Sequence, residues 1–100
     1  MVLHKGDNME KRIKITSEEN ENVQVLYSTY ISYMNILQFF MNNPITNQEL
    51  FDRKWEEAVQ LNIKLDEAKR AIEKEYKPAG EWDRYEFDFD KQQVVFIKNA

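Results

Sequence analysis

Side chains that could carry out catalysis or bind an ion are few and scattered in this 100-residue chain. The single histidine, His4, has no second histidine, cysteine or carboxylate at the spacing of a metal-ligand set. The chain has no cysteine, which excludes disulfides, thiolate metal sites and a cysteine nucleophile. A glycine-rich phosphate loop, a serine elbow and a zinc-binding helix motif are also absent. We therefore predict a protein that is not an enzyme, with no catalytic residue, metal site or cofactor.

Carboxylates are concentrated near the C-terminal end, where Asp83, Glu86, Asp88 and Asp90 follow one another at short intervals. Several such oxygens along one strand could in principle hold Ca²⁺ or Mg²⁺. A calcium loop also needs a glycine turn and backbone carbonyl ligands, and neither is indicated here. A polar strand face directed to solvent explains the same residues, and we favour that interpretation.

Charge and hydropathy exclude two classes of partner. Lys and Arg number 14 against 18 Asp and Glu, so the net charge is −4, and no basic pole is present for a nucleic-acid backbone. The most apolar window, residues 30–41, is much shorter than the roughly 20 residues that span a bilayer. The first 16 residues lack the apolar core of a secretory signal. We expect a cytoplasmic protein that binds neither nucleic acid nor membrane.

A first helix is predicted over residues 17–42. Thr16 and Glu19 form a capping box at its start, and Pro44 ends it because proline cannot donate a backbone hydrogen bond. Apolar residues at spacings of three and four predict one buried stripe that comprises Val23, Leu26, Tyr27, Tyr30, Tyr33, Met34, Leu37, Phe40 and Met41.

A second helix is predicted over residues 47–76, after a very short connection. Thr46 and Glu49 form a second capping box, and Ile45 and Leu50 stand at the positions of a hydrophobic staple. Its apolar stripe comprises Phe51, Trp55, Ala58, Leu61, Leu65, Ala68, Ile72 and Tyr76. The short connection predicts an antiparallel helical hairpin of coiled-coil type.

After Gly80 the apolar period changes from 3.6 to 2, which predicts a β-hairpin over residues 84–98. Residues 1–15 are expected to be flexible, with Arg12 to Ile15 as a possible short strand. The fold class is thus mainly α with a small β element (α+β), in which a long antiparallel helical hairpin precedes a C-terminal β-hairpin in one domain, residues 16–100. A candidate edge strand consists of Val94, Val95, Phe96 and Ile97. It is either open to peptide capture by strand addition or covered, within the fold or by a second subunit.

The helices carry more large apolar residues than their facing stripes can bury. Leaving several of these side chains in water would forfeit free energy comparable to the stability of a small domain, ~5–15 kcal/mol. Burial against a second copy, as a homodimer or higher oligomer, is the simplest solution, although the N-terminal segment and the hairpin could instead fold over them. The predicted interface comprises Val25, Ile31, Ile36, Phe39, Val59 and Ile63.

Residues 15–98 resemble a family of small accessory proteins in CXXX-repeat peptide modification systems. The resemblance is carried by Leu26-Tyr27, by Lys74-Glu75-Tyr76 and Trp82, by the aromatic-acid alternation of residues 85–90, and by Val94-Val95-Phe96. It implies a non-enzymatic partner of a peptide-modifying radical enzyme, with no catalytic residues to assign. Two functions therefore stay open: an accessory protein that binds a peptide or protein, and a purely self-associating structural domain.

Overall fold

The computed structural model describes residues 9–43 and 47–99. Along the chain the elements are β1 (Met9–Lys14), α1 (Ser17–Asn42), α2 (Gln48–Tyr76), β2 (Arg84–Asp88) and β3 (Gln93–Lys98). The fold is mainly α with a small β element, as predicted. The described chain divides into two compact units: a helical unit within residues 22–69, and a sheet unit that combines residues 9–21 with residues 70–99. The single domain expected over residues 16–100 stays a prediction.

The predicted capping box starts α1. The backbone N–H of Thr16 donates to Glu19 Oε1 at 2.9 Å, and the backbone N–H of Glu19 donates to Thr16 Oγ1 at 3.1 Å. Two N–H groups that lack partners within the helix are thereby satisfied. The bounds of α1 agree with the predicted range, 17–42.

The start of α2 is capped one residue later than expected. Asn47 Oδ1 accepts a hydrogen bond from the backbone N–H of Leu50 at 3.1 Å, so Asn47 is the N-cap. The predicted cap and staple residues Thr46 and Ile45 lie outside the described residues. At the other end the helix stops at Tyr76, ahead of Pro78 and of Gly80, whose φ of 105° suits glycine.

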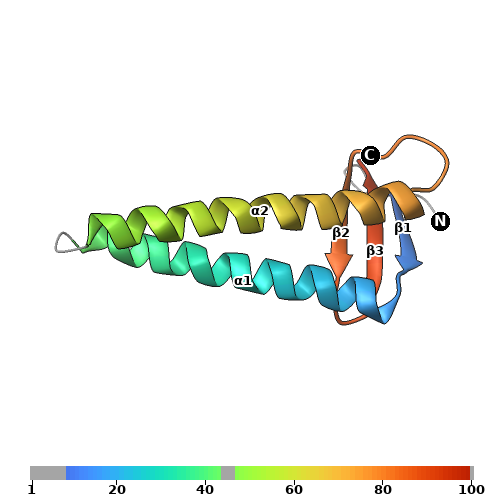
Figure 1. Cartoon of the computed structure of the whole chain (residues 1–100). Helices are drawn as coiled ribbons and strands as arrows, with labels where there is room; N and C mark the ends of the chain where they lie inside the picture. The colour runs from blue at the N-terminus through green and yellow to red at the C-terminus, as the bar shows by residue number, and fades with distance from the viewer. Residues whose placement is uncertain (1–8, 44–46, 100) are drawn as a thin grey trace. The chain divides into compact units, whose positions relative to one another are not determined.

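Within the helical unit, α1 and α2 run side by side in opposite directions (Figure 1). The buried residues Val23 and Leu37 on α1 and Ala58 and Leu65 on α2 are separated by multiples of seven. A seven-residue spacing is typical of the narrow contact seam of a coiled coil, in which only two positions per heptad are buried. The contact between the helices is therefore narrower than the two apolar stripes.

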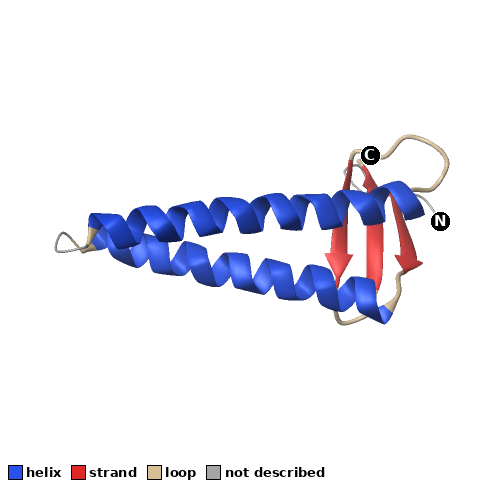
Figure 2. Ribbon diagram, in the orientation of Figure 1, coloured by secondary structure: helices blue, strands red, loops and turns tan. Residues whose placement is uncertain are grey.

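The sheet has three antiparallel strands in the order β1-β3-β2, which Figure 2 shows side by side. In the register, Val94 on β3 lies between Ile13 on β1 and Phe87 on β2. The prediction of an edge strand at Val94–Ile97 is wrong, because β1 pairs with the side of β3 that the hairpin leaves open. Both sides of β3 are hydrogen-bonded, and these four residues are only 0–4% exposed.

The described part of the N-terminal segment, residues 9–15, is more ordered than expected. Residues 9–14 form the strand β1, and Ile15 after it is buried. Ile15 makes two hydrogen bonds with Gln92 in the β2–β3 turn. The backbone N–H of Ile15 donates to the carbonyl oxygen of Gln92 at 3.0 Å, and the carbonyl of Ile15 accepts from Gln92 Nε2 at 2.6 Å. The short strand proposed near residues 12–15 thus exists with shifted bounds, while His4 lies outside the described residues.

The sheet unit has an aromatic core centred on Phe96. The rings of Trp82 and Tyr85 lie 6.3 Å and 6.1 Å from the ring of Phe96, in edge-on and tilted orientations that aromatic pairs favour. The first turn of α1 joins this unit through Asn20, whose Nδ2 donates to the carbonyl of Phe89 at 3.1 Å. This core explains why the hairpin is stable, since an isolated hairpin is marginal in water.

Candidate functional site

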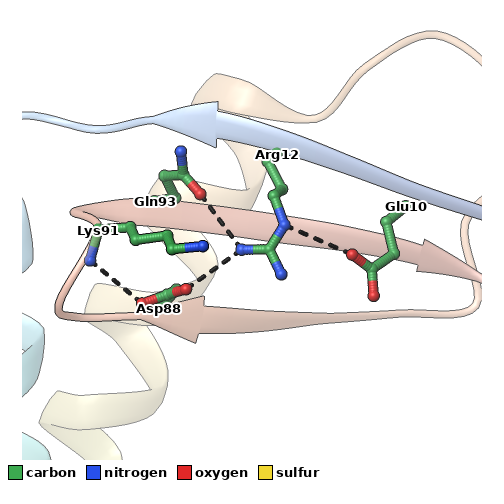
Figure 3. Close-up of polar contacts among 5 residues, drawn as sticks. All are labelled: Glu10, Arg12, Asp88, Lys91 and Gln93. Carbon is green, nitrogen blue, oxygen red and sulfur yellow. Dashed lines mark hydrogen bonds and ion pairs between the residues drawn. The ribbon is translucent and has the colours of Figure 1, made fainter.

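Arg12 and a backbone N–H group contact the carboxylate of Asp88 on the acidic face of the sheet. Arg12 on β1 reaches over the central strand, and its Nη1 lies 3.1 Å from Asp88 Oδ2 on β2, while its Nε lies 3.4 Å from Glu10 Oε2 (Figure 3). The backbone N–H of Lys91 donates to Asp88 Oδ1 at 3.1 Å. The hydrogen bond from Lys91, followed by that from Arg12, outweighs desolvation and lowers the pKa of Asp88.

Two other acids on this strand region also have partners. Asp83 Oδ2 accepts from the backbone N–H of Asn99 at 2.7 Å, and Glu86 Oε1 lies 3.6 Å from Arg84 Nε. Among residues 9–43 and 47–99, no group of three or more histidine, cysteine or acidic side chains could hold a metal ion. These contacts support a polar strand face whose carboxylates serve the sheet itself.

A different kind of surface lies on one flank of the helical unit. Tyr27, Met34 and Met41 recur every seven residues on α1, so they form one row, and Ile31 lies one turn from Tyr27. On α2, Trp55, Val59 and Ile63 recur every four residues and form a parallel row. These side chains are 36–71% exposed. We define the apolar side as Tyr27, Ile31, Met34, Met41, Trp55, Val59 and Ile63.

A shallow hollow of about 240 Å³ brings the two rows together. It is bordered on α1 by Tyr30 and Met34 and on α2 by Trp55, Val59 and Ile63, with Ala58 and Asn62 completing the wall. Among the residues that the structure describes, no charged one borders it. The hollow therefore places the α1 row and the α2 row on the same flank of the helical unit.

The opposite flank is polar. Tyr33 donates its hydroxyl proton to Glu57 Oε2 at 2.7 Å, and Lys54 Nζ lies 3.3 Å from the same oxygen and 5.4 Å from the centre of the Tyr33 ring. The hydrogen bond between Tyr33 and Glu57 lowers the pKa of Glu57 and raises the pKa of Tyr33. A groove of about 460 Å³ on this flank is also bordered by Arg53, Glu56 and Lys64. The helical unit thus has one charged flank and one apolar flank.

The six predicted interface residues are all exposed, by 40–62%, but the structure separates them into two groups. Ile31, Val59 and Ile63 belong to the apolar side. At about 100° per residue, Val25, Ile36 and Phe39 form a second row on α1. Val25 and Ile36 lie about 120–180° around the helix from Tyr27 and Ile31, and Phe39 lies about 80–120° from them. A flat partner surface centred on the apolar side does not reach Val25 and Ile36.

Four residues of the apolar side were expected in the buried stripes: Tyr27, Met34, Met41 and Trp55. A stripe drawn from all spacings of three and four is wider than the seam that two helices bury. A seven-residue repeat distinguishes the seam of α1 from the exposed row beside it. Val23, Tyr30 and Leu37 occupy one heptad position, on the seam, and Tyr27, Met34 and Met41 occupy another, beside the seam.

Helix α1 is also unusual in its charge. Between Asn22 and Asn43 the sequence contains no Asp, Glu, Lys or Arg, although exposed helix faces ordinarily carry charges. Even so, no helix within the described part of the chain combines the length and hydropathy needed to cross a membrane.

Comparison with known proteins found no matching family model, no matching curated protein and no matching solved structure.

Proposed function

We propose that this protein is a non-catalytic protein-binding module that binds its partner through the apolar side of the helical unit. The observation that supports the proposal is the exposure of seven large apolar side chains on one flank, next to an uncharged hollow. Contiguous apolar patches of this extent on soluble proteins mark interaction surfaces.

The apolar side presents a large apolar area to solvent. Seven side chains of about 200 Å² each, roughly half exposed, present on the order of 700 Å² of apolar surface. At about 25 cal/mol per Å², burying such a surface releases roughly 17 kcal/mol, from which the loss of translational and rotational freedom takes about 4–15 kcal/mol. The apolar side is therefore large enough for its burial to offset the cost of association.

The role in a peptide-modification system that the sequence resemblance implies stays a prediction, as does the cytoplasmic location. No contact of the described residues bears on either. The binding proposal is independent of both, since it depends only on the apolar side.

The test is affinity purification from the native host with two matched baits. Ile63→Asp places a carboxylate in the apolar side, and Gln60→Asp places the same group three residues earlier, beside the polar groove. We expect the wild-type and Gln60→Asp baits to recover the same proteins and the Ile63→Asp bait to lose them, with helicity by circular dichroism unchanged. Recovery of the same proteins by all three baits would show that the apolar side is not the binding surface.

A further inference from the structure

We infer that the occupant of the apolar side is a second copy of this chain, packed about a two-fold axis so that the two helical pairs form a four-helix arrangement. The inference builds on the proposed function and names the partner. In such an arrangement each helix buries the seam and the flank next to it, which together form the wide apolar face of a bundle helix.

The size of the apolar side fits a dimer interface. A stable protein–protein interface buries about 800 Å² on each partner, and the apolar side supplies on the order of 700 Å² before its polar margin, which includes Asn62, is counted. Because a two-fold axis brings the same surface of each copy together, a single such patch is sufficient.

The distribution of charge favours an identical partner on this flank. Each copy has a net charge of −4, so two copies repel each other unless they meet where charge is sparse. The stretch from Asn22 to Asn43 has no charged residue, and no charged residue of the described ranges borders the hollow. On the polar flank, by contrast, a partner copy would have to desolvate Arg53, Glu57 and Lys64.

Trp55 is the expected anchor of the contact. Its side chain is 50% exposed and stands at the border of the hollow. A two-fold axis that passes beside the hollow places the half-exposed ring of each copy, which is stacked on Phe51, against the hollow of the other. Large aromatic residues seated in this way contribute most of the energy of many interfaces.

The second apolar row, Val25, Ile36 and Phe39, supplies the matched control. Phe39 is more exposed than Ile63, at 62% against 44%, but it lies in the other row. Phe39→Asp therefore adds the same charge at a more accessible apolar position outside the proposed interface. Helicity by circular dichroism verifies that both variants fold.

The experiment measures mass by light scattering and sedimentation equilibrium on the full chain from about 1 to 100 µM. We expect twice the monomer mass of 12.1 kDa for the wild type and for Phe39→Asp, and the monomer mass for Ile63→Asp. Trp55→Ala is expected to raise the dimer dissociation constant at least tenfold. In a Trp82→Phe background, emission from Trp55 should shift to shorter wavelength as the dimer forms.

Two results would overturn the inference. A wild-type monomer throughout the concentration range would exclude a second copy as the occupant, and the affinity purification would then decide separately whether the apolar side binds another protein. Dissociation by Phe39→Asp with an intact Ile63→Asp dimer would assign the interface to the second row instead.

Discussion

The hydroxyl of Tyr76, in the last turn of α2, lies 2.6 Å from Glu19 Oε1, in the first turn of α1. The same carboxylate oxygen accepts the backbone N–H of Thr16, so one atom serves both the helix cap and the contact between the two helix ends of the sheet unit. Burial alone would raise the pKa of Glu19, but the hydrogen bonds from Tyr76 and Thr16 outweigh it and lower the pKa. The hydrogen bond to Glu19 raises the pKa of Tyr76 from 10.0 to about 12.

This pair predicts a pH window for the stability of the sheet unit. Glu19 has a lowered pKa in the folded state, so its contribution is present above its ordinary value of 4.5 and is lost as the pH falls. Tyr76 has a raised pKa, so its contribution is complete below 10.0 and is lost as the pH rises towards about 12. We expect wild type to exceed Tyr76→Phe in stability most between these limits. Urea unfolding monitored by Trp82 emission measures this difference, and two parallel pH profiles would contradict the assignment.

The backbone conformation of Gln92, in the β2–β3 turn, predicts that glycine is a better replacement than alanine at this position. Its φ of 56° lies in the left-handed region, where a side chain costs about 1–2 kcal/mol relative to glycine. Gln92→Gly and Gln92→Ala both lose the hydrogen bond to the Ile15 carbonyl. We expect the glycine variant to be more stable than the alanine variant by about 1 kcal/mol. Thermal unfolding of the two proteins tests this order, and equal stabilities would show that the backbone adjusts without strain.

The narrow seam of the helical unit can be tested by truncating one buried and one exposed residue of α1. Leu37 is 1% exposed, so Leu37→Ala should cost about 2–5 kcal/mol through lost contacts and a residual cavity. Val25 is 55% exposed and lies outside the apolar side, so Val25→Ala should change stability by less than about 0.5 kcal/mol. Chemical unfolding followed by helicity provides both values. A large loss from Val25→Ala would mean that the row at Val25 is covered.

The contact between Arg12 and Asp88 predicts that removing the guanidinium raises the pKa of Asp88 only in part. Because the largest contribution to the lowered pKa of Asp88 is the hydrogen bond from the Lys91 N–H, and Arg12 adds a smaller one, Arg12→Gln should raise that pKa only part of the way to its ordinary value of 3.8. Carboxyl chemical shifts followed by NMR titration measure the change. A pKa that does not move in the variant would mean that Arg12 and Asp88 do not interact in solution.

Local sequence patterns predicted those elements whose determinants lie within a few residues of one another. The bounds of α1 follow from the Thr16–Glu19 capping box and the proline after its end, and the change to a period of two predicted the β2–β3 hairpin. The all-apolar run at residues 94–97 is itself typical of a strand buried on both faces. The partner on its open side could not be identified in this way, because β1 lies about 80 residues earlier and its charged residues give only a weak strand pattern.

The amino-acid sequence by itself determined the two helices, the hairpin and a surplus of large apolar residues on an uncharged helix. Only the tertiary structure decided which of those residues are buried. Two antiparallel helices cover one narrow seam, so Leu37 lies inside while Met34, three residues earlier, lies beside it. Trp55 and Val59 lie on one flank, and the charged groove lies on the other. This separation likewise depends on how the two helices face each other, which is a property of their packing and not of either helix alone.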